Sequence, residues 1–383
     1  MISVSKLWCG SLGSGDALRY GPTAHRRPVV VWNCTRRCNL RCVHCYSQSE
    51  NRAYPGEITT TQGARFIHDL GEYGVPVILF SGGEPLMRLD IFNLAKLAEE
   101  LGIRAVLSTN GTLITQEVAA KIKTAGFSYV GVSLDGLNGT NDRFRGVQGA
   151  FDAAIKGIRN CINEGIKTGL RFTLTRYNFG DVPGIFKLVE EERISRVCFY
   201  HLVYSGRGSN LISNDLSHSE SREVMDQITT ATEALHGSRI DAEVLTVDNH
   251  ADAAYLYLKI KENSHARASK ARDILKMNGG NSSGIGICSV DPNGGVHADQ
   301  FWQHYTIGSI LERKFSELWG DENDPLLGAL RDRRSLLKGR CRTCRFLDIC
   351  NGNLRVRAEA VFGDLWAPDP ACYLTETEIT GHT

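Results

Sequence analysis

Residues 38–45 read Cys38-Asn39-Leu40-Arg41-Cys42-Val43-His44-Cys45 and lie just after the apolar run at 29–32. The three thiols are separated by three and then by two residues. Soft thiolate ligands suit iron–sulfur centres, and three of them in one loop can bind three irons of a four-iron cluster. The fourth iron would keep a position where a small molecule can bind. The loop therefore predicts a metal centre with an open site, at which chemistry can start.

A structural zinc site is the main alternative for these thiols. Zinc sites of this kind complete four ligands, whereas this loop has three thiols and no near fourth. His44 lies between two of the thiols and is too close in sequence to be the missing ligand. Cys34 is expected to end the first strand as a small buried side chain. The spacing therefore favours iron–sulfur over zinc, and the rest of the chain supplies the context that a short motif needs.

The cysteine loop resembles the signature of the radical S-adenosylmethionine (SAM) superfamily, and three later segments extend the resemblance. These segments are Ser81-Gly82-Gly83-Glu84-Pro85, Ser108-Thr109-Asn110-Gly111 and Val132-Ser133-Leu134-Asp135-Gly136. The resemblance implies that they bind SAM, with Glu84 accepting from its ammonium group and the two glycines letting the backbone approach a ligand. The implied SAM-binding residues are His44, Gly82, Gly83, Glu84, Ser108, Asn110, Ser133 and Asp135.

Strand-like and helix-like stretches alternate over the first two thirds of the chain. The apolar strand-like runs are 29–32, 77–80, 105–107, 129–134, 171–174 and 197–200, and helix-like stretches are 64–73, 91–101, 116–125, 150–164 and 185–191. Such alternation predicts an α/β fold with a parallel sheet and outer helices. The pattern alone also allows an open doubly wound sheet. The resemblance implies a partial (β/α)6 barrel with the SAM segments at the carboxyl ends of its strands.

A second group of cysteines lies near the C-terminus, at Cys341, Cys344, Cys350 and Cys372. A zinc ribbon is one interpretation, because a Cys-x-x-Cys pair with two later thiols suits tetrahedral zinc. The region also resembles the SPASM or Twitch extension of many radical SAM enzymes, whose full pattern has seven cysteines. Cys288 opens the region, but Asp299 and Leu354 stand where the pattern has cysteines. The resemblance therefore implies one auxiliary 4Fe-4S cluster on the four thiols, in addition to the SAM-binding cluster. Cys288 and Asp299 could be relics, substrate contacts or an exchangeable ligand.

Length and composition set broad limits. The 383 residues include 44 basic and 43 acidic residues, so net charge does not indicate nucleic acid or an anionic membrane as a partner. No apolar run approaches the length of a membrane span and no signal peptide is evident, which predicts a cytoplasmic protein. We expect an N-terminal segment at 1–28, the barrel at 29–240, a helical connector at 241–284 and the auxiliary-cluster region at 285–383.

Within the SPASM-type enzymes, the chain resembles those that trim side chains of modified tetrapyrroles. The similarity lies in Asn351-Gly352-Asn353-Leu354-Arg355-Val356-Arg357-Ala358-Glu359-Ala360 and in the segments 363–366 and 369–373. Segments 1–10 and 16–21 are similar to the didecarboxysiroheme deacetylase branch. The resemblance implies removal of both acetate side chains of 12,18-didecarboxysiroheme to give iron-coproporphyrin III, by means of a 5′-deoxyadenosyl radical. A low-potential electron donor such as ferredoxin or flavodoxin is implied as a partner.

Three other functions compete with this one. The heme d1 branch would replace propionates by oxo groups, and a peptide-modifying enzyme would use the extension to guide a precursor peptide. A non-catalytic iron–sulfur electron carrier would have no use for Glu84 or for the turn at 133–135. A tetrapyrrole site needs arginines for carboxylates beside apolar surface, and the chain has arginines at 36, 37 and throughout 331–357. Most of these are expected to be solvated, and the candidate substrate contacts are Tyr200, His201, Arg355 and Arg357.

Overall fold

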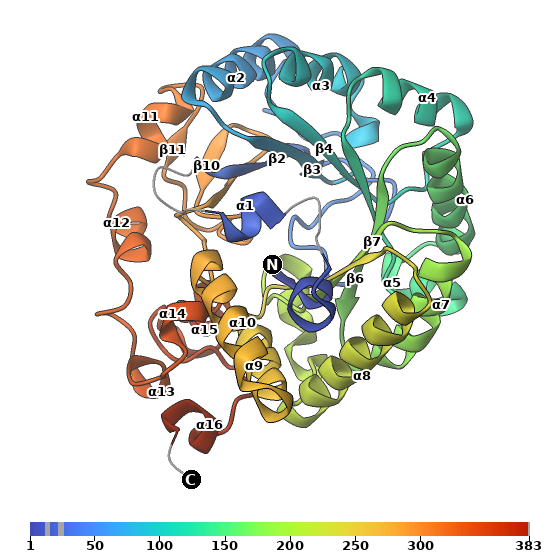
Figure 1. Cartoon of the computed structure of the whole chain (residues 1–383). Helices are drawn as coiled ribbons and strands as arrows, with labels where there is room; N and C mark the ends of the chain where they lie inside the picture. The colour runs from blue at the N-terminus through green and yellow to red at the C-terminus, as the bar shows by residue number, and fades with distance from the viewer. Residues whose placement is uncertain (12–15, 22–26, 382–383) are drawn as a thin grey trace.

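The computed structural model describes residues 1–11, 16–21 and 27–381, and its centre is a parallel sheet ringed by helices (Figure 1). Strands β2 to β8 are hydrogen-bonded in sequence order, and each neighbouring pair is parallel. The strands are β2 (Val29–Thr35), β3 (Val77–Gly82), β4 (Arg104–Thr109), β5 (Tyr129–Ser133), β6 (Thr168–Leu174), β7 (Arg196–His201) and β8 (Glu243–Val247). The helices between them are α2 (Thr60–Tyr73), α3 (Ile91–Glu100), α4 (Gln116–Thr124), α5 (Asn138–Arg145), α6 (Ala150–Asn163), α7 (Val182–Glu191) and α8 (His218–Gly237). The predicted α/β barrel architecture is confirmed.

Aromatic packing between the sheet and its first helix shows how local sequence produces this arrangement. Thr59 caps the start of helix α2: its side chain accepts from the Gln62 N–H while the Gln62 side chain accepts from the Thr59 N–H. The ring of Trp32 then packs against Phe66 of α2, with centroids 5.5 Å apart. Gly63 is needed at the contact, because a Cβ there would lie 2.8 Å from the Trp32 ring. The pair is fully buried in the main core, which fixes α2 on the outer face of the sheet.

The sheet extends beyond the six expected strands on both sides. The segment 241–284, expected as a helical connector, contributes strand β8 as well as helices α9 (Ala251–Asn263) and α10 (His265–Asn278). On the opposite side, β9 (Ile287–Val290) pairs in parallel with β2. Strand β8 is not predicted from the sequence because Glu243–Val247 is one short run of five residues. The auxiliary region therefore shares the barrel's sheet.

The described residues of the N-terminal segment run antiparallel along β8, from its carboxyl half toward its amino-terminal end. Strand β1 (Ile2–Ser3) pairs antiparallel with β8, and helices η1 (Ser5–Cys9) and α1 (Asp16–Tyr20) lie within the ring of helices (Figure 1). Arg19 forms an ion pair with Glu243, the first residue of β8. The carboxyl-terminal ends of the strands therefore remain the end at which a site can form.

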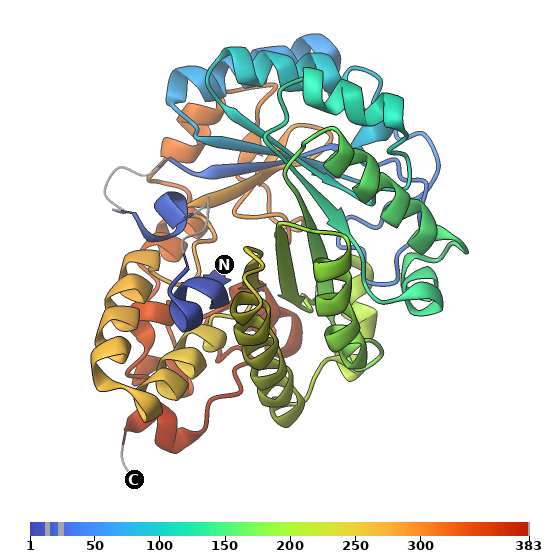
Figure 2. The ribbon, with the colours of Figure 1, turned by 45° about the vertical axis from the view of Figure 1, so that its right-hand side comes forward.

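The C-terminal region is a hairpin followed by short helices (Figure 2). β9 continues through a turn into β10 (Gly295–His297), with which it pairs antiparallel, and β10 pairs in turn with β11 (Gly308–Ser309). No helix among the described residues is long and apolar enough to cross a bilayer. The helices are α11 (Phe315–Gly320), α12 (Pro325–Arg331), α13 (Gly339–Arg342), α14 (Leu347–Cys350), α15 (Arg355–Phe362) and α16 (Glu376–Thr380).

Candidate functional site

The loop that follows β2 carries the first three thiols at the carboxyl end of the sheet. Cys38 and Cys42 are buried, Cys45 is half-buried, and none of the three forms a disulfide. The Leu40 N–H donates to Cys38 Sγ at 3.4 Å, and Arg145 Nη1 donates to Cys42 Sγ at 3.4 Å. Donors of this kind stabilise thiolate sulfur and tune iron–sulfur clusters. The local environment therefore fits sulfur ligands that carry negative charge.

The protonation of these thiols bears on metal binding. Burial raises the pKa of Cys38 to about 12 and also raises the pKa of Cys42. A cluster would therefore displace protons when it binds, as thiolate-bound metals do. Among the described residues no three candidate ligands are already arranged around one metal position.

Glu84 lies at the end of β3, buried beneath the neighbouring strand ends. Its Oε1 accepts from Thr109 Oγ1 at 2.8 Å and from the Leu86 N–H at 3.1 Å, and its Oε2 accepts from the Asn110 N–H at 2.8 Å. Burial raises the pKa of Glu84 to about 7, and the three hydrogen bonds only partly offset this effect. A buried carboxyl of this kind would gain most from a cationic partner, such as an ammonium group.

Gly82 and Gly83 allow close approach, but the partner is the chain itself. A Cβ on Gly82 would lie 2.2 Å from the Thr35 carbonyl oxygen, and one on Gly83 would lie 2.3 Å from the Arg37 carbonyl oxygen. The Gly83 N–H donates to Thr35 O at 2.7 Å, and the Glu84 N–H donates to Arg37 O at 2.8 Å. Both glycines therefore allow the end of β3 to pack closely against main-chain carbonyl groups, which holds the cysteine loop against this strand. Contact of Gly82 and Gly83 with SAM stays a prediction.

Asp135 connects the cysteine loop to the sheet. Its Oδ2 lies 3.3 Å from His44 Nε2 and 2.5 Å from Arg145 Nη2, and its Oδ1 accepts from the Thr173 N–H at 2.7 Å. Burial lowers the pKa of His44 despite the nearby carboxylate, so its imidazole is neutral near pH 7. Arg145 thus bridges Asp135 and Cys42. A role for His44 and Asp135 in SAM binding stays a prediction. In that role Asp135 would bind SAM while it also pairs with Arg145.

The remaining SAM-binding candidates lie at the ends of β4 and β5. Asn110 Nδ2 donates to Asn39 Oδ1 in the cysteine loop at 2.8 Å. Arg171 of β6 crosses the sheet and donates to Ser108 Oγ, a path that Gly131 leaves open because it has no side chain. Ser133 is the register partner of Arg171. Ser108, Asn110 and Ser133 therefore lie on neighbouring strand ends, as expected.

The four C-terminal thiols line one small cavity of about 20 Å³. Cys341 lies on α13, Cys350 ends α14, Cys344 lies between these helices, and Cys372 precedes α16. All four are free, and burial raises the pKa of each thiol. Phe346, Leu347, Leu374 and Ile379 contribute apolar wall. Four thiols on one cavity are a donor set that suits an iron–sulfur cluster and equally suits zinc, although no three of them surround a common metal position in this structure.

Cys288 and Asp299 lie outside this four-thiol cavity. Cys288 is fully buried in β9, with its Sγ 3.8 Å from the Val29 carbonyl oxygen. Asp299 is also buried; Ser283 Oγ donates to its Oδ2, and the Phe301 N–H donates to its Oδ1 at 2.8 Å. Asp299 thus has hydrogen-bond partners close to the hairpin, whereas Cys288 contacts the first residue of β2.

Tyr200 and His201 end β7, the strand next to β8. Burial raises the pKa of Tyr200, and nearby Arg171 opposes the increase. His201 Nε2 lies 3.0 Å from Asp252 Oδ2, and Tyr373 Oη donates to Asp252 Oδ1 at 2.7 Å. His201 is 3% exposed, so a satisfied buried contact already accounts for its position. A contact of either residue with substrate stays a prediction.

Arg355 and Arg357 are both fully buried and bonded to the protein. Arg357 pairs with Asp369 through Nε at 2.9 Å and Nη2 at 3.1 Å, and also donates to the carbonyl oxygens of Leu202 and Asp248. Arg355 donates to main-chain carbonyls, including Ala367 O at 2.6 Å. A substrate carboxylate could reach these guanidinium groups only by displacing such bonds. If Arg355 or Arg357 bound substrate, the protein would lose buried hydrogen bonds that stabilise the fold. Their role as substrate contacts stays a prediction.

Two arginines of the site were not predicted from the sequence. Arg145 and Arg171 act on residues 103 and 63 positions away, at Cys42 and Ser108 respectively. No local spacing signals such contacts, because the strand order alone brings them together. The positive charges of Arg145 and Arg171 therefore reach the site only through the tertiary fold.

Comparison with known proteins agrees with this geometry. Residues 32–189 match the model of the Radical SAM superfamily. Fe-coproporphyrin III synthase of Methanosarcina barkeri is 55% identical, with 99% of each chain covered, and pre-heme d1 synthase of Dinoroseobacter shibae is 45% identical, with 94% of this chain and 91% of that protein covered. Among solved structures, Streptococcus suis SuiB bound to S-adenosylmethionine matches with a TM-score of 0.73 at 21% identity, covering 91% of this chain and 78% of that one. The chain belongs to the radical SAM superfamily, and therefore to a class of enzymes that use SAM and a 4Fe-4S cluster.

Proposed function

We propose that this chain is a radical SAM enzyme of heme biosynthesis that removes the two acetate side chains of 12,18-didecarboxysiroheme and yields iron-coproporphyrin III. The observation that carries the proposal is its 55% identity with Fe-coproporphyrin III synthase over nearly the whole length of both proteins. The matched region covers 99% of each chain, so it spans the N-terminal segment, the barrel and the C-terminal region and is not confined to the cofactor-binding core.

The roles of the chain's own residues follow from their positions. Cys38, Cys42 and Cys45 would hold the cluster, and Arg145 would stabilise the charge on Cys42. Glu84 would bind the SAM ammonium group at the β3 end. When bound, the cluster and SAM together supply a 5′-deoxyadenosyl radical that abstracts hydrogen from a substrate C–H bond. The protein would orient the substrate and exclude water from that radical.

The raised pKa of Glu84 leads to a pH prediction. If Glu84 binds the SAM ammonium group as a carboxylate, its pKa of about 7 in the SAM-free protein means that a proton competes with SAM. We expect SAM binding to weaken as pH falls below 7, approaching about tenfold per pH unit. Anaerobic equilibrium dialysis with labelled SAM between pH 5.5 and 8.5 measures this dependence.

The same pKa has a consequence for folding. Because the folded-state pKa lies above the ordinary value of 4.5, this group's contribution to stability is complete below pH 4.5 and is lost as pH rises through about 7.

Two variants test the predicted pH dependence of SAM binding. Glu84→Gln should bind SAM more weakly and with little pH dependence, whereas Glu117→Gln at an exposed position should behave like the unmodified protein. A pH-independent affinity in the unmodified protein would contradict the assigned role.

A second 4Fe-4S cluster would occupy the cavity between Cys341, Cys344, Cys350 and Cys372. Four thiols leave no open iron, so electron transfer is the simplest role, fed by a low-potential donor such as ferredoxin or flavodoxin. Cys350→Ala should lower the iron content by about half and leave SAM binding intact. Cys288→Ala is the matched comparison and should keep all the iron; equal iron loss in both variants would contradict the four-thiol assignment.

Pre-heme d1 synthesis is the second candidate function, because the chain is also 45% identical with pre-heme d1 synthase. The two functions give different products from one tetrapyrrole substrate. Incubation of the reconstituted protein with SAM, dithionite and didecarboxysiroheme, followed by mass spectrometry, separates them. Loss of acetates would support the deacetylase function. Oxo groups in place of propionates would show that pre-heme d1 synthesis is the function instead.

A further inference from the structure

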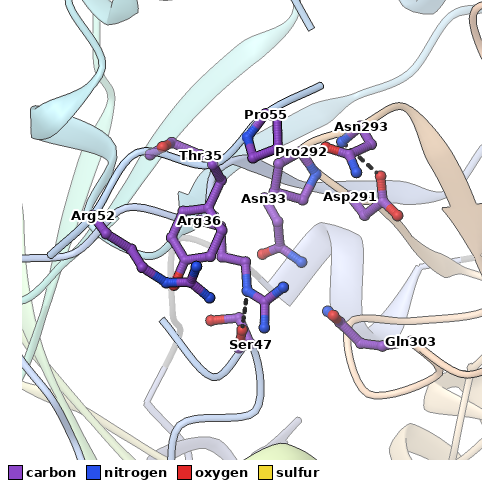
Figure 3. Close-up of a pocket in the computed structure, with 11 residues that line it drawn as sticks. Asn33, Thr35, Arg36, Ser47, Arg52, Pro55, Asp291, Pro292, Asn293 and Gln303 are labelled. Carbon is purple, nitrogen blue, oxygen red and sulfur yellow. Dashed lines mark hydrogen bonds between the residues drawn. The ribbon is translucent and has the colours of Figure 1, made fainter. Parts of the chain in front are cut away.

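A cavity of about 360 Å³ opens beside the cysteine loop, between the end of β2 and the β9–β10 hairpin (Figure 3). Neither the superfamily motifs nor the candidate substrate residues account for it. Its lining includes Asn33, Arg36, Ser47, Arg52, Tyr54 and Gln303. The volume lies within the range of small-molecule sites, and the side chains around it are mainly polar.

Two guanidinium groups and one aromatic ring form one wall of this cavity. Arg36 lies 4.9 Å and Arg52 lies 4.5 Å from the ring centroid of Tyr54. Arg36 is half-buried and uses its Nε to donate to the Ser47 carbonyl oxygen at 3.1 Å. Figure 3 shows its terminal nitrogens directed into the space between Ser47, Asn33 and Gln303. Among the described residues no carboxylate forms an ion pair with Arg36, so its charge is available to a ligand.

The acidic groups near the cavity are already engaged. Asp291 Oδ1 accepts from the Asn293 and Gly295 N–H groups at 2.8 Å each, and its Oδ2 lies 3.2 Å from His297 Nε2. Glu57 Oε1 accepts from the Arg36 N–H at 2.7 Å. Arg52 Nε lies 3.6 Å from Glu50 Oε2, which is an exposed pair and therefore a weak one. The residues that line the cavity include two cationic side chains, Arg36 and Arg52, and one anionic side chain, Asp291, so the lining carries an excess of one positive charge.

The cavity adjoins the loop that would hold the reactive cluster. Ser47, which lines the cavity, has its Oγ 3.3 Å from Cys45 Sγ. Tyr46 Oη donates to Asn33 Oδ1 on the cavity wall at 2.9 Å. A molecule anchored here by its periphery would therefore extend toward the cysteine loop, which is the geometry that hydrogen abstraction requires.

We propose that Arg36 and Arg52, with Tyr54 between them, bind carboxylate side chains of the tetrapyrrole and position its ring over the cysteine loop. This inference rests on the proposed function. Arginine binds carboxylates bidentately through its planar fork, and a half-buried, unpaired arginine gains most from such a partner. Both guanidinium groups lie over the phenol ring of Tyr54, a cation–π arrangement that keeps the two positive charges on the same wall of the cavity. The carboxylate contact thus comes from the β2 loop, in a region distant in sequence from the arginine-rich segment 331–357.

The test compares a tetrapyrrole with and without free carboxylates. Iron-coproporphyrin III and its tetramethyl ester are titrated anaerobically into the cluster-containing protein, and binding is followed by the Soret band. We expect the unmodified protein to prefer the acid, and Arg36→Gln/Arg52→Gln to weaken acid binding about 10- to 100-fold while changing ester binding little. Arg37→Gln is the matched control, since Arg37 is exposed and donates to Asn51 Oδ1 rather than lining the cavity.

The possible results distinguish failure of the proposed tetrapyrrole function from failure of the proposed arginine site. If the unmodified protein binds neither compound, the tetrapyrrole function fails, and the inference fails with it. If it prefers the acid and the double variant keeps that preference, the function stands and the arginine site is wrong. Iron content and SAM cleavage without substrate report whether each variant retains its clusters. If the double variant loses its clusters, the single variant Arg52→Gln decides, because the Arg52 side chain is 62% exposed and we expect its replacement to disturb the fold little.

Discussion

Replacing Cys38, Cys42 and Cys45 together by alanine is expected to abolish SAM cleavage and to leave about half of the iron in the protein. The reason is that the cluster that cleaves SAM would depend on these three thiols, whereas Cys341, Cys344, Cys350 and Cys372 line a separate cavity. Anaerobic reconstitution, followed by iron determination and chromatographic measurement of 5′-deoxyadenosine, gives both quantities on one sample. The loss of activity should be complete rather than graded, because no other described thiol lies in that loop.

Cys161→Ala provides the control for this experiment. Cys161 is a buried cysteine of α6, remote in sequence from both thiol groups, and its replacement should preserve SAM cleavage and iron content. Loss of all iron in the triple variant would show that the second thiol group does not hold a cluster independently. Any SAM cleavage above background in the triple variant would contradict the assignment of the first cluster.

Arg357→Met is expected to lower the free energy of unfolding by about 3–5 kcal/mol, because it leaves Asp369 as an unpaired charge in the interior. Both side chains are completely buried, and they share two hydrogen bonds at 2.9 and 3.1 Å. The effect is large because water cannot replace the lost partner. Anaerobic urea unfolding of the cluster-containing protein, followed by circular dichroism, measures it.

Two further variants distinguish a structural arginine from a substrate contact. Arg357→Met/Asp369→Asn removes both charges and should recover a substantial part of the lost stability. Lys338→Ala breaks an exposed ion pair with Asp364 and should change stability far less. If Arg357→Met instead unfolds like the unmodified protein and only weakens tetrapyrrole binding, then Arg357 contacts substrate and the buried pair is not what holds the C-terminal region.

The sequence signals for the site are local, and the structure places the segments that carry them at the ends of neighbouring strands. The thiol spacing at 38–45 and the segments at 81–85, 108–111 and 132–136 each lie within a few residues of the chain. Alternation of strands and helices then places their ends on one edge of the sheet. The α/β barrel followed from the same repeating pattern and the resemblance, and both agree with the structure.

Contacts between distant segments could not be predicted in this way. Strand β8 and the pairing of β9 with β2 depend on short runs that have no individual signal. The close approach of Gly82 and Gly83 to main-chain carbonyl groups more than 40 residues earlier in the chain had no local signal, and their contact with SAM stays a prediction. Arginine composition likewise pointed to 331–357, where Arg355 and Arg357 have become interior supports. Only tertiary structure distinguishes such supports from Arg36, whose charge has no carboxylate partner among the described residues.

The most direct test of the proposed function is a turnover measurement that counts both products. Reconstituted protein is incubated anaerobically with SAM, a low-potential reductant and 12,18-didecarboxysiroheme, and the tetrapyrrole and 5′-deoxyadenosine are quantified together by mass spectrometry. We predict that iron-coproporphyrin III accumulates in step with 5′-deoxyadenosine, with a species that has lost one acetate as the intermediate. SAM cleavage that leaves both acetates in place would contradict the proposed function.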